Sequence, residues 1–207
     1  MSAPTEIPAR FSRVRTYLEG LPDGLASYPE CRVKSSLFRA IVESIGTEAL
    51  EGLPGVVLDM VHDPKPISSW IPHVYGNVVS AAIRDVVLDS DQAFSRCCYE
   101  AQAGLFSSPA YKLLMIAASP RMVLKAIQAR WSAFNQGTTA TGHVENDTGG
   151  LHLRHPVGLF DGCARASVVE ALRASMELAR GGHVVEVEVL EASTTGFTLH
   201  TAWRPRA

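Results

Sequence analysis

The spacing of hydrophobic residues changes once along this chain, close to residue 138. Before that point apolar residues recur at intervals of three and four, which is typical of amphipathic helices. After it, apolar and polar residues alternate over two pairs of short segments, and one helical stretch separates the pairs. The pattern predicts an α+β chain with a mainly helical part over residues 1–137 and a ββαββ part over residues 138–207.

Helix start and stop signals divide the first part into about six helices. Serine or aspartate precedes most of them, serine–proline steps open two, and glycines close several. Between the second and third helices, residues 52–66 are rich in proline and glycine and predict a connector with one short apolar turn at 56–60. The expected helices span 11–19, 35–46, 68–87, 91–104, 109–118 and 120–136.

Two hairpins and a helix are expected in the second part. Strands at 139–145 and 151–155 flank a turn at Asn146–Gly150, and strands at 183–191 and 197–203 flank a second turn. A helix over 163–180, closed by Gly181 and Gly182, lies between the hairpins. We expect one domain, in which the helices pack on a four-stranded antiparallel sheet.

Composition narrows the class of protein. The chain has 207 residues, 46% of them hydrophobic and 19% charged, which predicts a folded globule. A net charge of −2 argues against nucleic-acid binding through a broad basic surface. No apolar run is long enough to span a bilayer, and the start lacks a signal segment. Four cysteines without a CxxC motif predict a reduced, cytoplasmic protein.

Several segments together resemble a known group of proteins. They are LPDGLASYPECRVKSSLFRAIVE, WIPHVYGNV, SPRMVLKAIQARWSAFNQG, HPVGLFDGCARASVVEALRASMELARGG and HVVEVEVLEASTTGFTLHTAWRP. This layout resembles an uncharacterised, myxobacteria-rich family of small proteins. It is more distantly similar to the superfamily of haem–nitric-oxide-binding domains, vinyl-reductase-type sensor domains and TRAPP vesicle-tethering subunits. The resemblance implies a helical layer on a four-stranded sheet, often dimeric, with an apolar cleft between the two layers.

The haem chemistry of that superfamily is not carried over. Residues 107–134 contain no histidine for a proximal ligand, and Ala117 stands where a Tyr-x-Ser-x-Arg pattern would need its tyrosine. The cysteine-rich patch of the vinyl-reductase-type domains is also absent, since only Cys163 falls in the last third. We therefore expect no cofactor and no metal.

Two features could carry catalysis. Alternation places His143, Glu145 and His152 on one face of the first hairpin and the fourth candidate, His155, on the apolar side. Three such groups on one face could hold a metal, but a solvated polar face is the favoured interpretation. Cys163 at a helix start could be a nucleophile, but Asp161 would oppose its thiolate, and packing is favoured. No P-loop, GxGxxG, HExxH or GxSxG motif occurs.

The functional prediction is a non-catalytic sensor or small-molecule-binding module with an apolar cleft between helices and sheet. The alternatives are a TRAPP-like dimerisation scaffold, and an enzyme that uses Cys163 or the His143/His152 cluster. The expected partners are an apolar or amphipathic small molecule and a second copy or another protein. The candidate ligand-binding residues are Trp70, His73, Tyr75, Trp131, Phe134 and Cys163.

Overall fold

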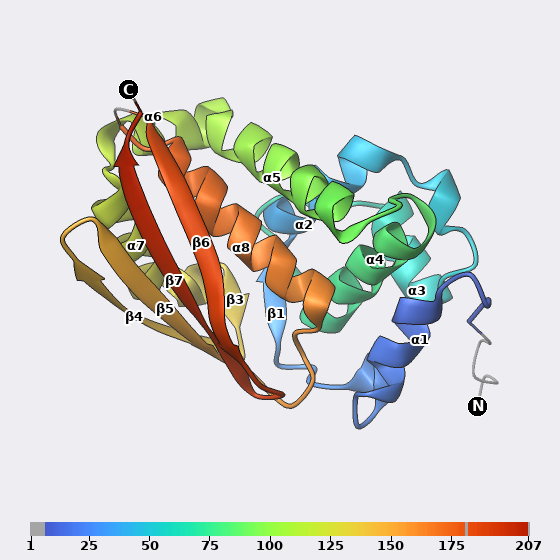
Figure 1. Ribbon diagram of the computed structural model, residues 1–207. Helices are drawn as coiled ribbons and strands as arrows, with labels where there is room; N and C mark the ends of the chain where they lie inside the picture. Colours follow the sequence, from blue (N-terminus) through green and yellow to red (C-terminus); the bar gives the residue numbers. More distant parts are fainter. Residues whose placement is uncertain (1–6, 181, 207) are drawn as a thin grey trace.

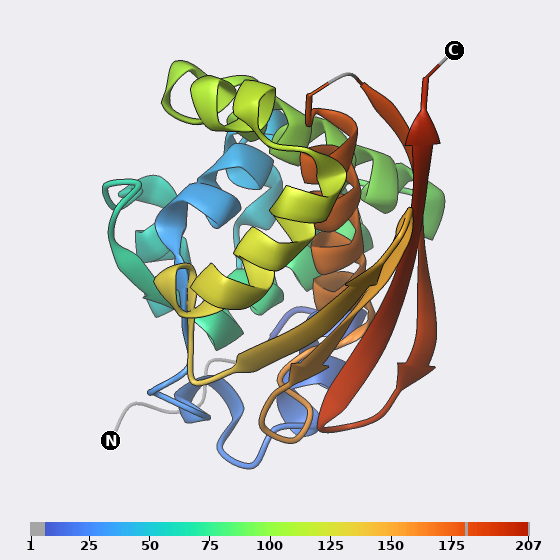
Figure 2. The ribbon, with the colours of Figure 1, turned by 90° about the vertical axis from the view of Figure 1, so that its left-hand side faces the viewer.

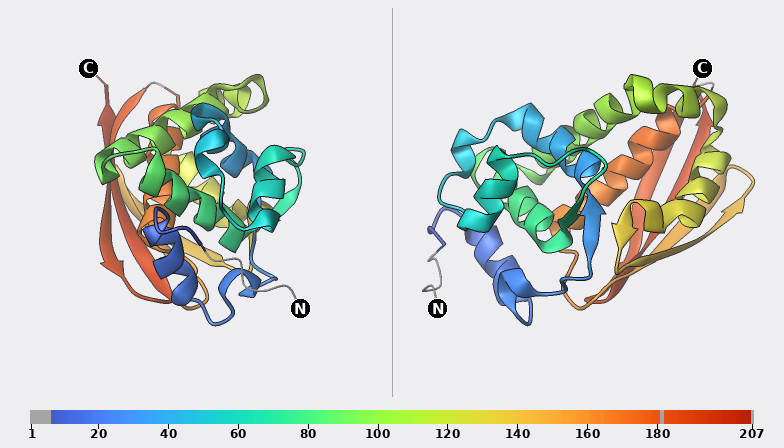
Figure 3. Two further views of the ribbon diagram at one scale, coloured as in Figure 1. Left: turned by 90° about the vertical axis from the view of Figure 1, so that its right-hand side faces the viewer. Right: turned by 180° about the vertical axis from the view of Figure 1, so that it is seen from behind.

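Helices cover one face of a four-stranded antiparallel sheet, so the α+β fold class is confirmed. The computed structural model describes residues 7–180 and 182–206. Figure 1 shows the sheet beside the helices, and Figure 2 shows it nearly edge-on with the helices on one side. The two views in Figure 3 show the same layers from the other directions.

The part before residue 138 is mainly helical, as the spacing predicted. Its elements, with η marking 3-10 turns, are α1 (Ser12–Glu19), η1 (Gly24–Ala26), β1 (Arg32–Lys34), α2 (Ser35–Ile45), η2 (Glu48–Leu50), α3 (Gly55–His62), β2 (Trp70–Pro72), α4 (His73–Val86), α5 (Asp91–Ser107), α6 (Pro109–Ala117), α7 (Pro120–Arg130), η3 (Trp131–Ala133) and β3 (Asn135–Gln136).

The remaining part is the predicted ββαββ unit. Its elements are β4 (Thr139–Glu145), β5 (Thr148–Arg154), α8 (Gly162–Glu177), β6 (His183–Ala192) and β7 (Gly196–Pro205). The strand order is β4-β5-β7-β6, with every neighbouring pair antiparallel. The two hairpins therefore join through β5 and β7. On β7, Phe197, Leu199, Thr201 and Trp203 alternate toward the helices and are buried.

A second, three-stranded sheet was not predicted. Its order is β2-β1-β3, and its strands contain only two or three residues. The expected helix from Ser68 begins instead at His73, because Pro72 has extended backbone angles (φ −59°, ψ 133°) and belongs to β2. The expected helix over 120–136 ends at Arg130, and its last residues form η3 and β3.

Three predicted helix caps are confirmed, and several helix boundaries differ from those predicted. The side chains of Ser90, Ser119 and Asp161 each accept a backbone N–H at the start of α5, α7 and α8. The connector at 52–66 contains the two-turn helix α3 rather than one turn, α5 runs past Gly104, and α8 ends at Glu177.

The first hairpin turn is shorter than expected. Asn146, with φ +48°, and Asp147 connect the strands, so Gly149 and Gly150 belong to β5. A Cβ on Gly149 would lie 2.4 Å from a methyl group of Leu124, so the glycine lets α7 approach the strand closely. Gly182 has φ +62°, while Gly181 lies outside the described residues.

A continuous hydrophobic core joins the two parts of the chain. It extends from Phe11, just before α1, and Val14 on α1, through α4, to Leu199 and Trp203 on β7. Between helices and sheet, where a cleft was expected, buried rings and aliphatic side chains line the seam. They include Leu151, Leu153, Leu159, Phe160 and Phe197.

Candidate functional site

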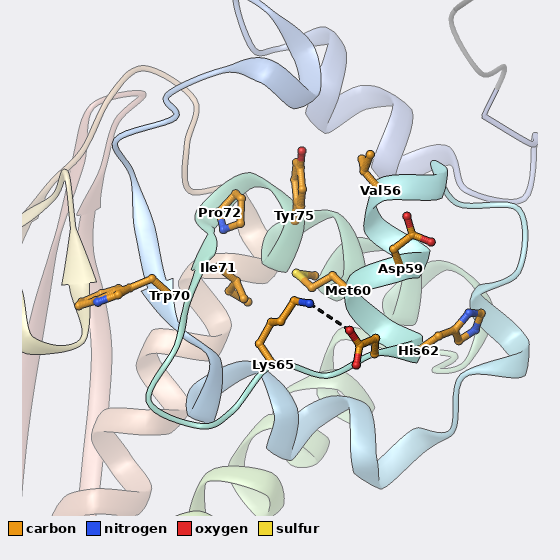
Figure 4. A pocket seen from close by; sticks show the side chains of 10 residues that line it. Val56, Asp59, Met60, His62, Lys65, Trp70, Ile71, Pro72 and Tyr75 are labelled. Atoms are coloured by element: carbon orange, nitrogen blue, oxygen red, sulfur yellow. Dashed lines mark hydrogen bonds and ion pairs between the residues drawn. The ribbon is translucent and has the colours of Figure 1, made fainter.

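A surface pocket of about 570 Å³ lies within the helical part of the molecule. It is bounded by α3, by the loop that follows α3, by β2 and by the first turn of α4, as Figure 4 shows. Its lining residues are Val56, Asp59, Met60, His62, Asp63, Lys65, Trp70, Ile71, Pro72 and Tyr75.

The pocket has an apolar floor and aromatic side walls. Met60 and Ile71 are buried at its base, whereas Trp70 and Tyr75 are half-buried. Trp70 pairs with Lys34 across the β1–β2 ladder, and the Lys34 ammonium lies 4.0 Å from the centre of the indole ring. The same ammonium donates to the carbonyl oxygen of Ser68 at 2.5 Å, which ties the loop before β2 to the small sheet.

Charged side chains form the rim. Lys65 and Asp63 make an ion pair of 3.0 Å, and His62 lies 3.3 Å from a carboxylate oxygen of Glu51. Among the residues that the structure describes, the Asp59 carboxylate has no hydrogen-bond or ion-pair partner. Because Asp63 is paired with Lys65, Asp59 carries the unpaired negative charge among the described lining residues, while the Lys34 ammonium beside Trp70 adds a positive one.

His73, the first residue of α4, faces the core rather than the pocket. Its Nε2 donates to Asn135 Oδ1 at 3.2 Å, because an amide oxygen can only accept, and its Nδ1 has no partner in the described part of the chain. Its ring centre lies 5.1 Å from that of Phe160. Burial lowers the pKa of His73 to about 4, despite the hydrogen bond with Asn135, so the imidazole is neutral.

A second buried histidine lies on the other side of this aromatic cluster. The ring centre of His155 is 4.9 Å from that of Phe160 and 6.0 Å from that of Phe197. Nδ1 of His155 donates to the carbonyl oxygen of Pro156 at 2.8 Å, which leaves Nε2 without a partner among the described residues. Burial lowers the pKa of His155 as well. The sequence placed His155 on the apolar side of its strand, and its burial agrees.

The other predicted ligand-binding residues do not line the pocket. Trp131 lies in η3, where its indole N–H donates to Thr138 Oγ1 at 2.9 Å, and Phe134 is a half-buried residue before β3. Cys163 is buried at the start of α8. Its pKa is raised to about 12, first by burial and then by the charge of Asp161, so it is a protonated thiol at neutral pH.

The histidine cluster of the first hairpin lies on the outer face of the sheet. His143 pairs with Gly150, and His152 pairs with Thr141, so the two histidines share a face as predicted. Both ring nitrogens of His152 are engaged, because Nε2 accepts from Arg154 at 3.3 Å and Nδ1 donates to Thr198 Oγ1 at 3.0 Å. Within residues 7–180 and 182–206, no three His, Cys, Asp or Glu side chains converge as a metal site.

Sequence reasoning singled out Trp70 and Tyr75, which line this pocket, but none of the residues of the opposite wall. Val56, Asp59 and Met60 have the three- and four-residue spacing of one helix face, yet the surrounding prolines and glycines suggested a connector. The helical spacing was the available signal. The approach of α3 to β2 could not be inferred from the sequence, because β2 itself was not predicted.

Comparisons with known proteins give a distant likeness of fold. No family model and no curated protein matches this chain. An Fe(II) unliganded H-NOX protein from K. algicida is 10% identical with a TM-score of 0.49, covering 84% of this chain and 97% of that one. A glycine variant of that protein is 11% identical with a TM-score of 0.48, covering 83% and 96%. A structure described as probing haem distortion in the H-NOX family is 9% identical, with a TM-score of 0.47 and coverage of 84% and 97%.

These structures are distantly similar to this chain in layout, and the narrower resemblance to the myxobacterial family stays a prediction. The residues present do not fit a haem. The rings of both buried histidines contact Phe160 in tilted geometry, with ring centres 5.1 Å and 4.9 Å away, so Phe160 occupies the space beside each imidazole where an axially bound haem would have to lie. None of the helices in the described ranges is long and apolar enough to cross a membrane.

Proposed function

We propose that this protein is a non-catalytic module that binds a small molecule in the pocket between α3, β2 and α4. The pocket itself carries the proposal. Its volume of about 570 Å³ suits a drug-sized molecule, and its apolar floor with a few polar rim groups is the usual chemistry of ligand sites. This pocket differs from the helix–sheet cleft that the sequence suggested, since its lining residues come from α3, the loop after α3, β2 and α4.

The ligand that fits has an apolar, flat body and a neutral or cationic head. Trp70 and Tyr75 offer aromatic surface, while Met60 and Ile71 offer an aliphatic base. The unpaired Asp59 carboxylate at the rim would attract an ammonium group and repel a carboxylate of the same shape.

Two probes of matched shape and opposite charge test this proposal. Naphthylmethylammonium should bind the purified protein, detected by saturation-transfer NMR and calorimetry, and naphthylacetate should bind at least several-fold more weakly. Val56→Trp should abolish binding, because Val56 lines the pocket and its side chain is 51% exposed, so a larger ring fills the space without disturbing the core.

Val157→Trp is the matched control, since Val157 is 52% exposed and does not line the pocket. Asp59→Asn should reduce the preference for the cationic probe while leaving its apolar contacts. Equal loss in the Val56 and Val157 variants, or no binding of either probe, would rule out this pocket as the ligand site.

The alternative functions give different results in native mass spectrometry of the purified chain. A TRAPP-like dimerisation scaffold would give a bare homodimer with no retained organic mass. For an enzyme, the raised pKa of Cys163, caused by burial, counts against a nucleophile, and the engaged ring nitrogens of His152 count against a metal ligand.

A further inference from the structure

The surface around α6 and the start of α7 combines exposed apolar side chains with basic ones. On α6, Leu113 is 79% exposed and Ile116 is 54% exposed, and on α7 Met122 is 56% exposed. These three residues lie within ten positions of one another and flank the short link between the two helices. In Figure 2, α6 runs along the upper edge of the molecule and α7 crosses the front below it.

The stretch of chain that builds this surface carries basic residues and no acidic ones. Residues 101–144 contain no aspartate or glutamate, although the chain has 21 acidic residues, and they contain Lys112, Arg121, Lys125 and Arg130. All four are exposed, and in the described part of the chain none of them pairs with a carboxylate.

The chain directly after α8 adds one more positive charge to this surface. The backbone N–H of Arg180, after α8, donates to the carbonyl oxygen of Ala118 at 2.8 Å, which places another exposed arginine at the α6–α7 link. The carboxylate of Glu177, the last residue of α8, accepts the hydroxyl of Tyr99 at 2.7 Å and is a single negative charge against these five basic residues.

We propose that the α6–α7 surface, defined by Leu113, Ile116, Met122 and the basic residues around them, docks on an anionic phospholipid membrane. The three apolar side chains would insert at the boundary between headgroups and acyl chains, and the lysines and arginines would contact anionic headgroups. The apolar side chains of this helix edge suit the acyl chains, and the basic side chains beside them suit the anionic headgroups.

A second copy of the chain fits this surface less well. Across a two-fold axis the basic residues would face one another and repel, because an isologous contact pairs each patch with itself. A stable dimer interface also buries about 800 Å² per partner, well beyond what three side chains supply.

Vesicle flotation of the purified full chain tests the proposal. The protein should float with vesicles of equal parts phosphatidylcholine and phosphatidylserine, should stay behind with phosphatidylcholine alone, and should be released by high salt. The double variants Leu113→Gln/Ile116→Gln and Arg121→Glu/Lys125→Glu should each lower the bound fraction about tenfold or more.

Leu190→Gln is the control, because Leu190 is 58% exposed on β6 and belongs to a different surface. Circular dichroism and thermal unfolding establish that each variant is folded. Absence of flotation with the anionic vesicles would overturn the proposal, as would an equal loss in the Leu190 variant. Concentration-dependent dimerisation that Leu113→Gln/Ile116→Gln abolishes, without vesicle binding, would assign the surface to a second copy instead. Binding to polyglutamate but not to vesicles would assign it to an acidic protein.

Discussion

At the scale of single residues, the two buried histidines are the most unusual groups in the core. Each gives one ring N–H to an oxygen of the protein, and each has a second nitrogen without a partner among the described residues. A buried imidazole in this arrangement must be neutral, because protonation would place a charge among Phe160, Phe197 and their aliphatic neighbours. The histidines therefore link the stability of the fold to pH.

Stability should fall as the medium becomes acidic. Burial lowers the pKa of His73 from its ordinary value of 6.5 to about 4 in the folded state, so the unfolded chain binds more protons between these values. The stabilisation is complete above about pH 6.5 and is lost as the pH falls toward 4, to the extent of about 3 kcal/mol. About 2 kcal/mol of this should already be lost between about pH 7 and about pH 5, and urea unfolding at these two pH values measures it.

His73→Phe isolates the contribution of that residue. Phenylalanine keeps the contact with Phe160 but does not titrate, so the variant should lose less stability than the natural chain over the same pH interval. Its stability near neutral pH should be lower, because Asn135 Oδ1 loses its donor. An unchanged pH dependence in this variant would show that His73 does not bear the linkage.

At the scale of elements, a small hydrogen-bond network fixes α1 to the rest of the molecule. The hydroxyl of Tyr17 donates to the carbonyl oxygen of Leu159 at 3.0 Å, and Asn77 Nδ2 donates both to that hydroxyl at 3.0 Å and to the same carbonyl at 2.7 Å. Three segments that are distant in sequence, α1, α4 and the loop before α8, meet at one buried point. Burial raises the pKa of Tyr17 beyond its ordinary range, so the phenol keeps its proton.

Removing the buried hydroxyl should destabilise the fold. Tyr17→Phe deprives Leu159 of one donor and Asn77 of one acceptor, and we expect a loss of about 1–2 kcal/mol in the free energy of unfolding. Tyr28→Phe is the comparison, since its hydroxyl donates to the carbonyl oxygen of Val157 at 2.7 Å in an exposed position and should cost under about 0.5 kcal/mol. Equal losses in chemical unfolding of the two variants would contradict a special role for the buried network.

The same scale shows what could be predicted from the sequence. Helices and hairpins of seven or more residues have enough periods to be recognised, and capping serines and Asp161 marked their starts. Strands β1, β2 and β3 are too short to show a period, and each gains its hydrogen bonds from a segment far along the chain. The candidate site is hard to predict for the same reason. Trp70 lies on one of these short strands, and its place is set by its pairing with Lys34 on another.

At the scale of the whole molecule, the two parts of the chain share one core. Buried residues from α1, α4, α5, α8 and the four-stranded sheet belong to one cluster, and α5 packs along α8. We therefore retain the prediction of a single domain, in which neither the helical part nor the ββαββ part keeps its hydrophobic face covered alone.

Unfolding should accordingly be one cooperative event. In hydrogen exchange followed by mass spectrometry across a denaturant series, peptides from 12–130 and from 139–205 should become exchange-competent at the same midpoint. Two separate midpoints would mean that the parts are independent folding units.

The small sheet has a consequence for the order in which the newly made chain can assemble. Its central strand, β1, lies near the beginning of the chain, but one of its two neighbours is β3 at Asn135–Gln136. During synthesis β1 must therefore wait, with one edge uncovered, until roughly two thirds of the protein has left the ribosome, and Tyr17 waits longer still for Leu159. The early helices therefore remain accessible to chaperones for most of translation. Their native packing forms only when the later segments, including the last hairpin, have been made.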